Sequence, residues 1–385
     1  MSEPLDPAAL RPHYARFLFD DRILLTGHSH QAWPDVAREG LLEAYEDASF
    51  LVDDKWGKAM EAADAVREAV AARLDAAPDE IALGQNTHEL VTRFLSALDL
   101  RARPHVVTTT GEFHSLHRQL TRMAEAGLEV SWVDAAPVET LAERLAAAVR
   151  DDTAALMAST VLFETATVVP RLATAVDVAR EAGAEVLLDT YHHVGVRPFE
   201  LSAYGDECFV TGGGYKYLQW GEGTCFLRVP THRAFRPIFT GWFSDFANLA
   251  QPRGDRIGYG PRPADVFAGS TYDPVSHYRA RRVIRFFDVQ GLTVERLRAL
   301  YARQTQRIVD GLEGYRVRSP RDPDARGGFV AIEIENASAV VAALRKRAIT
   351  TDARGRLLRL GPAPYVTDEE IDRALATLRE VAPPT

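Results

Sequence analysis

The chain has 385 residues, of which 46% are hydrophobic and 26% are charged, and its formal net charge at pH 7 is -9. This length allows a full core and two domains, and the composition is that of an ordinary globular protein. The negative charge argues against a nucleic-acid-binding protein, which needs a basic face to neutralise phosphates. The N-terminus does not resemble a signal peptide, and no apolar run approaches the ~20 residues that span a bilayer, so we expect a soluble, cytoplasmic protein with no membrane partner.

The two cysteines, Cys208 and Cys225, both fall in apolar stretches that are typical of strands. Two buried thiols suit a reducing compartment. They provide neither a disulfide framework nor a metal cluster, and we therefore expect no metal site.

Short apolar stretches alternate with amphipathic stretches from about residue 80 to residue 230. This alternation predicts an α/β fold with a mostly parallel central sheet and helices on both faces. In such a sheet, ligands bind at the carboxyl ends of the strands. The expected strands are Glu80–Gly84, His105–Thr110, Ala154–Ser159, Glu185–Asp189, Cys208–Gly212 and Thr224–Val229, and the expected helices are Glu89–Leu98, Ser115–Ala126, Val138–Arg150 and Leu172–Ala182.

Residues 230–272 interrupt this alternation, because they are rich in glycine, proline and aromatic residues. A long irregular stretch inside a compact domain is usually functional. After Pro274 the pattern predicts one long helix to about Leu312, followed by strand-like YRVRS and GGFVAIEI.

The C-terminal part continues with a helix over Ala337–Arg347, strand-like LLRLG and a final helix that begins at the capping-box pattern Thr367–Glu370. We therefore predict a large cofactor-binding domain at 26–274 and a smaller α+β domain at 275–385, on which residues 1–25 pack.

One lysine stands among glycines and aromatic residues between two predicted strands, in Gly212-Gly-Gly-Tyr-Lys216-Tyr-Leu-Gln-Trp-Gly-Glu-Gly223. A lysine with few solvating neighbours can have an amine that is neutral enough to attack an aldehyde. The glycines would let the backbone approach a bulky ligand closely. Considered alone, an exposed lysine in a turn is the safer interpretation.

A carboxylate ends the predicted strand Glu185–Asp189, with one strand between it and the lysine. Pyridoxal 5'-phosphate (PLP) needs such an acid to keep its ring nitrogen protonated, so that the ring can draw electrons from the substrate. His192 could hydrogen-bond that carboxylate or the phenolic oxygen of the ring. Asp189 could instead cap a helix, but the order of acid, strand and lysine favours PLP held on Lys216 as a Schiff base.

Two further strand ends run directly into predicted helices. In Asn86-Thr87-His88-Glu89 the free backbone N–H groups and the helix dipole suit a phosphate, although this is also an ordinary capping sequence. In Gly111-Glu-Phe113-His-Ser115 the phenylalanine could stack on a flat ring or be a core aromatic, and the sequence favours neither.

The order of these motifs resembles aminotransferase class V, the fold-type I PLP enzymes, and within it kynureninase, from about Leu24 to Pro364. Tyr215-Lys216-Tyr217-Leu218 resembles the kynureninase lysine motif. The resemblance implies that Lys216 is the Schiff-base lysine and that Tyr215 contacts the phosphate and relays protons.

Other motifs imply further cofactor contacts. Asp189-x-x-His192-x-x-Gly195 is similar to the family's Asp-x-x-His-x-x-Gly, which implies the partner of the ring nitrogen and its neighbour. Asn86-Thr87-His88 resembles the phosphate loop, and Phe113 falls where kynureninases stack a phenylalanine on the ring.

Later segments extend the resemblance to substrate and partner contacts. Gly241-Trp242-Phe243 resembles a segment whose tryptophan lies near cofactor and substrate. Phe267-Ala-Gly-Ser270-Thr271 resembles a segment that reaches into the partner subunit's site, which implies a homodimer with shared active sites. The stretch from Asp352-Ala-Arg354 to Pro364 resembles the one whose arginine holds the substrate carboxylate, which implies that role for Arg359.

The sequence departs from the family mainly at substrate positions. Gly27-His28-Ser29-His30-Gln31 stands for the family's Gly-Asn-Ser-Leu-Gly, and Ser244-Asp245 stands for a Gly-His pair. Thr271 replaces the asparagine expected at the aromatic ring of the substrate, and Leu116 replaces an acid. His28 and His30 could orient a side chain other than that of kynurenine, or they could be solvated imidazoles of a polar loop.

The resemblance implies hydrolytic Cβ–Cγ cleavage of kynurenine or a related amino acid to alanine and an aryl acid, as in tryptophan catabolism. The alternatives are transamination or β-elimination of a sulfur substituent. A cysteine desulfurase is less favoured, because it needs a mobile cysteine and Cys225 lies in a predicted strand. A non-catalytic relative is the remaining alternative, and the presence of Lys216, Asp189 and Arg359 together argues against it.

Overall fold

The central sheet is built from seven strands, which the computed structural model places in the order β2-β8-β7-β6-β5-β3-β4. The model describes residues 3–19, 21–252 and 254–384. Strands β3 to β7 are mutually parallel, whereas β8 is antiparallel to both of its neighbours, so the predicted mostly parallel sheet is confirmed. The strands are β2 (Ile81–Gly84), β3 (His105–Thr109), β4 (Glu129–Val133), β5 (Thr153–Ser159), β6 (Glu185–Asp189), β7 (Cys208–Gly213) and β8 (Cys225–Arg228).

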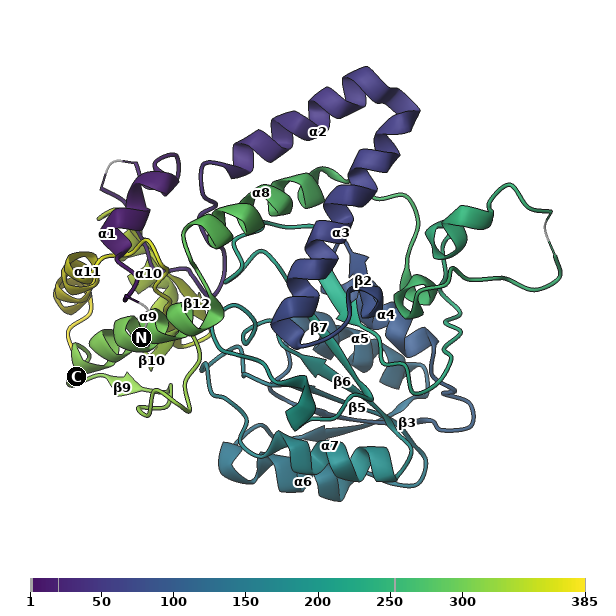
Figure 1. Cartoon of the computed structure of the whole chain (residues 1–385). Helices are drawn as coiled ribbons and strands as arrows, with labels where there is room; N and C mark the ends of the chain where they lie inside the picture. The colour runs from purple at the N-terminus through teal and green to yellow at the C-terminus, as the bar shows by residue number, and fades with distance from the viewer. Residues whose placement is uncertain (1–2, 20, 253, 385) are drawn as a thin grey trace.

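Helices cover both faces of this sheet, because successive strand residues point to opposite sides. Leu187 of β6 packs in one hydrophobic cluster with Leu90 and Phe94, whereas Leu188 packs in another with Leu172. Figure 1 shows α6 and α7 together on one side of the sheet. The covering helices are α4 (Thr87–Ser96), α5 (His114–Glu125), α6 (Leu141–Ala148) and α7 (Leu172–Glu181), close to the predicted ranges.

The prediction of one long helix after Pro274 is wrong. The structure has two helices, α8 (Val275–Val289) and α9 (Val294–Asp310). Gly291 between them has φ +61, a conformation that ends helices and that favours glycine. The side chain of Thr293 then caps α9 by accepting from the amide of Arg296.

Two long helices that the sequence pattern left unassigned, α2 (Ala37–Leu51) and α3 (Lys55–Leu74), pack against α8. Figure 1 shows α2 at the upper edge of the molecule, above α8. Its Tyr45 and Phe50 side chains are exposed. Within the described ranges, no helix combines the length and the apolar character needed to cross a membrane.

The C-terminal part forms a second, four-stranded antiparallel sheet in the order β12-β13-β10-β9. Strand β1 (Ile23–Leu24) pairs with β11 (Ile349–Thr350), so the N-terminal segment lies against this part. The predicted capping box at Thr367 is confirmed. The domain limits at residues 26 and 275 stay a prediction. The remaining elements are α1 (Pro7–Leu10), β9 (Arg316–Val317), β10 (Val330–Glu333), α10 (Ala337–Arg345), β12 (Asp352–Arg354), β13 (Leu357–Leu360) and α11 (Asp368–Val381), with 3₁₀ helices at Arg11–Tyr14, Val52–Asp54, Pro78–Glu80, Val138–Thr140, Leu201–Ala203, Trp242–Asn248 and Pro263–Phe267.

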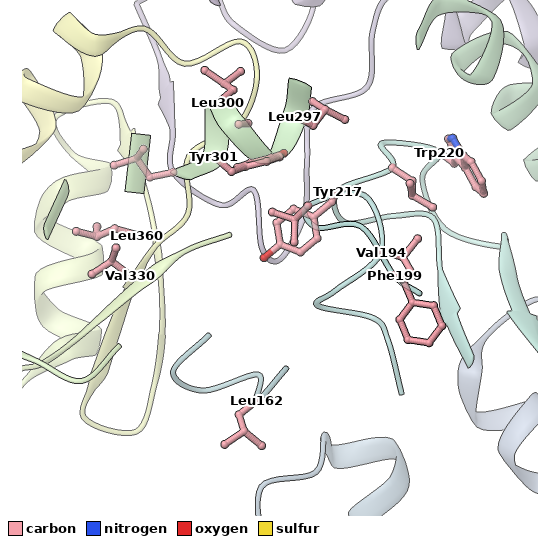
Figure 2. Packing of buried hydrophobic residues seen from close by; sticks show 14 of the residues in the cluster. Leu162, Val194, Phe199, Tyr217, Trp220, Leu297, Leu300, Tyr301, Val330 and Leu360 are labelled. Carbon is pink, nitrogen blue, oxygen red and sulfur yellow. The ribbon is translucent and has the colours of Figure 1, made fainter. Parts of the chain in front are cut away.

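One hydrophobic cluster joins the two sheets, and it anchors the turn that carries Lys216. Tyr217 is 1% exposed and packs edge-on against Tyr301 of α9, with ring centroids 5.6 Å apart. Figure 2 shows Tyr217 next to Tyr301, with Val330 and Leu360 of the smaller sheet in the same cluster. Burial of this ring anchors the backbone next to the lysine to the smaller sheet.

Candidate active site

Three strands of the central sheet have polar residues at or near their carboxyl ends, and these residues lie side by side. Ser159 of β5 is opposite Asp189 of β6, and Asp189 is opposite Thr211 of β7. All three line a cavity of about 400 Å³. The cavity therefore lies at the carboxyl ends of the parallel strands, where this class of sheet binds ligands.

The same cavity collects eight of the site residues that the sequence predicts, from separate strand ends and turns. Apolar side chains, among them Leu116, Met157 and Phe163, form much of the remaining wall. The predicted residues that line it are Asn86, Thr87, His88, Phe113, Asp189, His192, Tyr215 and Lys216.

The Lys216 side chain is buried, with 4% exposure, so the alternative of an exposed turn lysine is wrong. Its Nζ lies 2.7 Å from Nε2 of His192 and 4.5 Å from the ring centroid of Tyr191. Burial lowers the pKa of Lys216 to about 7, although the Asp189 carboxylate acts in the opposite direction. A large fraction of this amine is therefore neutral at pH 7 and can act as a nucleophile or a base.

The Asp189 carboxylate is oriented by its own turn, because Oδ1 accepts a 2.8 Å hydrogen bond from the amide of Tyr191. This local bond occupies one oxygen, as in other Asx turns. Burial raises the pKa of Asp189, and Lys216 lowers it. The carboxylate is thus poised in a low-dielectric site where a cationic partner would favour its charged form.

His192 points its Nε2 at Lys216 rather than at Asp189. Burial and the nearby Lys216 hold the pKa of His192 well below its usual range, so the ring is neutral. Its Nδ1 is buried, and no partner for it lies among the described residues. The ring nitrogen therefore has hydrogen-bonding capacity that this part of the chain does not use.

The glycines before Lys216 make room for the protein's own side chains, which corrects the expectation that they face a ligand. A Cβ on Gly213 would lie 2.2 Å from the Tyr191 hydroxyl, and one on Gly214 would lie 2.3 Å from Oγ1 of Thr224. The absence of a side chain at Gly213 instead leaves space for Tyr191, whose ring lies beside the amine of Lys216.

The first turn of α4 borders the cavity. The Asn86 side chain caps this helix by accepting from the amide of Glu89 at 2.9 Å, so the capping interpretation holds for that side chain. The amides of Thr87 and His88 belong to the first turn, which has no partners inside the helix. Together with the helix dipole, they suit an anion.

Cys225 lies at the start of β8 on the cavity wall, buried and close to two hydroxyl groups. Its Sγ is 3.5 Å from the Tyr191 hydroxyl and 3.7 Å from Oγ1 of Thr87. Burial raises the pKa of this thiol. A buried, protonated thiol on a strand does not provide the mobile nucleophile of a cysteine desulfurase.

Sequence reasoning missed Glu112, a buried acid beside this site. One carboxylate oxygen accepts from Oγ1 of Thr109 and from the amide of Ser159, and the other accepts from Oγ of Ser159 at 2.6 Å. Burial raises the pKa of Glu112 to about 7, partly against these hydrogen bonds. An acid three residues after the end of a buried strand was the available signal.

The predicted substrate arginine lies next to the cavity rather than on its wall. Arg359 is buried, donates from Nε and Nη2 to Asp352, and donates from Nη1 to the carbonyl of Phe163 at 2.7 Å. Phe163 itself lines the cavity. Arg354, on the neighbouring strand, has Nη1 3.6 Å from Oδ2 of Asp352.

The two predicted loop histidines have different environments. His28 is fully buried, and its Nε2 lies 2.8 Å from Oδ1 of Asp352. His30 is largely exposed and stacks on Tyr215, with ring centroids 5.3 Å apart. Its Nε2 lies 3.9 Å from Oε1 of Glu222, so His30 sits at the rim of the cavity.

A second cavity, of about 510 Å³, contains Ser270 and Thr271 and shares Gln85 with the first. Trp242 is 40% exposed, and its Nε1 donates to Oγ1 of Thr271 at 3.2 Å. Within one chain, these three predicted residues are therefore not brought to Lys216. Asp245 lines neither cavity and accepts from the side chain of Asn248.

The residues around Lys216 fit PLP in their chemistry. A largely neutral buried amine suits covalent attachment to an aldehyde, and Asp189 suits a protonated ring nitrogen. His192 has an unused buried ring nitrogen, Phe113 supplies an aromatic wall 5.3 Å from the amine, and the start of α4 suits a phosphate.

Residues 295–378 match the family model of the kynureninase C-terminal domain. The chain is 23% identical over 388 residues to a kynureninase of Geobacillus thermodenitrificans (strain NG80-2), covering 95% of this chain and 89% of the relative. It is 24% identical over 342 residues to the uncharacterized aminotransferase YcbU of Bacillus subtilis (strain 168), covering 87% and 88%.

The fold has solved counterparts. A structure of a C-DES variant with glycine covalently linked to its PLP cofactor matches with a TM-score of 0.84 and 19% identity, covering 96% of this chain and 98% of the other. This likeness bears on the fold alone. In sequence the chain is thus distantly similar to kynureninases and to an uncharacterized aminotransferase, and in fold it is similar to the C-DES structure.

Proposed function

We propose that this protein is an enzyme that binds PLP on Lys216 and acts on an amino acid, cleaving a Cβ–Cγ bond hydrolytically as kynureninases do. The observation that carries the proposal is the buried Lys216 amine, 2.7 Å from His192 in a cavity that also contains Asp189. The family model and the kynureninase relative support the finer assignment. Water would add its hydroxyl to the γ-carbonyl carbon and a proton to Cβ, which releases an aryl acid and alanine.

Most residues around the cavity have a role in holding the cofactor. When bound, PLP supplies an electron-withdrawing ring that stabilises negative charge on the substrate. Asp189 would keep the ring nitrogen protonated, and Phe113 would pack against the ring. The first turn of α4, at Asn86, Thr87 and His88, would bind the phosphate together with the Tyr215 hydroxyl.

Lys216 also provides a base at the right place. With a pKa of about 7, its Nζ can accept the α-proton of the substrate near neutral pH. His192 is neutral and within hydrogen-bonding distance, so its Nε2 can orient the amine or share the proton. Burial raises the pKa of Tyr215 to about 12, so this hydroxyl stays protonated and donates.

Substrate and partner contacts extend the proposal. Arg359 would hold the substrate carboxylate through paired hydrogen bonds. Trp242, Ser270 and Thr271 would complete the site of the partner subunit in a homodimer. Ser270 and Thr271 line a separate cavity of this chain, and Trp242 donates a hydrogen bond to Thr271, which is consistent with this role. The cytoplasmic location stays a prediction.

Transamination or β-elimination is the second candidate. The apolar side chain of Leu116 lies on the cavity wall where kynureninases have an acid, and Thr271 stands where they have an asparagine. Both changes alter the surroundings of the substrate rather than the lysine and its acid.

The test adds L-kynurenine and 3-hydroxykynurenine to cofactor-loaded protein and measures alanine and the fluorescent anthranilate. L-cystine and an amino-acid and oxo-acid pair serve as the parallel substrates for elimination and transamination. Turnover of a kynurenine supports the hydrolase. Turnover of only the other substrates would overturn the hydrolase and leave the PLP enzyme, and the absence of any cofactor absorbance would overturn both.

A further inference from the structure

Asp352 connects His28 to Arg359 in a buried cluster beside the Lys216 cavity. Its Oδ1 accepts hydrogen bonds from Nε2 of His28 at 2.8 Å and from Nε of Arg359 at 2.9 Å, and its Oδ2 accepts one from Nη2 of Arg359. Asp352 of β12 and Arg359 of β13 are direct cross-strand partners. The arrangement is therefore built into the smaller sheet, and His28 reaches it from the N-terminal segment.

These bonds leave Arg359 with a defined free edge. A guanidinium has five N–H groups, one on Nε and two on each terminal nitrogen. Asp352 takes one on Nε and one on Nη2, and the carbonyl of Phe163 takes one on Nη1. One N–H on each terminal nitrogen is not used by these bonds, and N–H groups on Nη1 and Nη2 can bind a carboxylate through two parallel hydrogen bonds.

Among the described residues, Asp352 is the hydrogen-bond partner of the His28 ring, whose Nδ1 has none. His28 is 0% exposed, and burial lowers its pKa to about 4, so the ring is neutral at pH 7 and gives its single proton to Asp352. Its Nδ1 lies where a Cβ on residue 361 would approach to 2.1 Å, so Gly361 makes room for the ring. The amide of Gly27 bonds the carbonyl of Gly361 at 2.8 Å, which fixes the loop.

The same cluster touches the lysine side of the cavity through one buried phenylalanine. The ring of Phe329 lies 4.5 Å from the ring of His28 and 5.7 Å from that of His192. The guanidinium of Arg359 lies 5.5 Å from its centroid. Phe329 is therefore a shared neighbour of His28, Arg359 and His192.

We propose that His28 is a positioning residue, which donates a hydrogen bond to Asp352 and so orients its carboxylate. Asp352 in turn holds Arg359 so that the free N–H groups of the guanidinium point to a substrate carboxylate. The inference rests on the proposed function, because it takes an amino acid as the substrate. It assigns to His28 an indirect role, which differs from the direct substrate contact expected from the sequence.

The test measures the dissociation constants of L-alanine and of ethylamine, which lacks the carboxylate, on cofactor-loaded protein from the change in cofactor absorbance. His28→Leu removes the donor, whereas His28→Gln keeps an N–H at a similar reach. We expect His28→Leu to weaken L-alanine about tenfold with ethylamine unchanged, and His28→Gln to restore most of the loss. His232→Leu is the matched control, because His232 lies 3.6 Å from Glu185 outside both cavities.

Two failures are distinguishable. If the unaltered protein binds L-alanine no better than ethylamine, the carboxylate contact of the proposed function is overturned. If it prefers L-alanine and His28→Leu keeps that preference, the positioning role is overturned. Should His28→Leu not fold, His28→Asn, whose shorter amide cannot reach Asp352, takes its place, and equal L-alanine affinities for the Asn and Gln variants would overturn the inference.

Discussion

The two cavities differ in how their polar groups are satisfied. Around Lys216 the amine faces His192, and the Asp189 carboxylate accepts from a backbone amide. In the second cavity the buried His277 has both ring nitrogens without partners among the described residues, and the hydroxyl of Tyr272 is in the same condition.

Buried polar groups normally find partners within the protein or in what binds to it. The first cavity is thus organised by one chain, which suits a cofactor site. Among the described residues, the first cavity leaves Nδ1 of His192 without a partner, whereas the second leaves both ring nitrogens of His277 and the Tyr272 hydroxyl, as expected of a surface that another molecule completes.

The largest effect is expected from Lys216→Ala. The variant has no amine for covalent attachment or for the proton transfer, so turnover should fall by at least about a thousandfold. The protonated-imine absorbance should disappear after desalting. Lys58→Ala, which removes an exposed lysine on α3, is the control and should behave as the unaltered protein. Retention of absorbance and turnover in Lys216→Ala would show that the first cavity is not the reaction centre.

A smaller loss is expected from Asp189→Asn, which keeps the shape and the turn but cannot hold a negative charge. Turnover should fall by about a hundredfold at saturating substrate, because the ring nitrogen loses the partner that keeps it protonated. Asp152→Asn, in an exposed loop pair with Arg150, is the control for loss of a carboxylate. An active Asp189→Asn protein would assign Asp189 to the turn alone.

The strand-end residues could be predicted because a short-range pattern places them. Asp189 ends an apolar run, and parallel strands bring such ends to one edge, so its neighbourhood to Lys216 follows from the order of elements. Strand β4 was missed since it is a half-buried edge strand with a weak apolar pattern. The break between α8 and α9 rests on the φ of Gly291, which periodicity does not report.

The cluster around Arg359 could not be predicted, because it depends on contacts between distant segments. A parallel bridge between Thr26 and Gly361 brings the segment of His28 next to the smaller sheet, where His28 meets Asp352. No local sequence pattern predicts that pairing. Similarly, the acid Glu112 accepts two of its hydrogen bonds from Ser159, a residue of another strand. The sequence indicated that these residues were unusual and could not say what they touch.

The pH dependence of stability at Glu112 tests whether water is excluded from the surroundings of this acid, beside the first cavity. Its pKa is about 7 in the folded protein and near 4.5 when exposed, so between these values the folded state binds more protons than the unfolded state. The stability contributed by the protonated acid is therefore present below pH 4.5 and lost as the pH rises through 7. Glu112→Gln cannot ionise, so its stability relative to the unaltered protein should improve from pH 5 to pH 8 by on the order of 2–3 kcal/mol. Urea unfolding at both pH values measures this, and Glu143→Gln on the surface should show no such change; a pH-independent difference for Glu112→Gln would mean that the acid is solvated.

The smallest effect is expected at the second cavity, from Thr271→Val. If a partner subunit completes the site, this variant loses about tenfold in kcat/KM, the cost of a hydrogen bond to a substrate group. A mixture with Lys216→Ala should then exceed both parents, because half of randomly exchanged dimers carry one intact site with Lys216 from one chain and Thr271 from the other. About a quarter of the unaltered activity should return. Thr377→Val, at a half-buried position on α11, mixed with Lys216→Ala gives the control, in which activity should only be diluted. If activity is also only diluted in the Thr271→Val mixture, each active site is made by one chain. The unpartnered polar groups of His277 and Tyr272 would then have to bind a molecule other than a second copy of this chain.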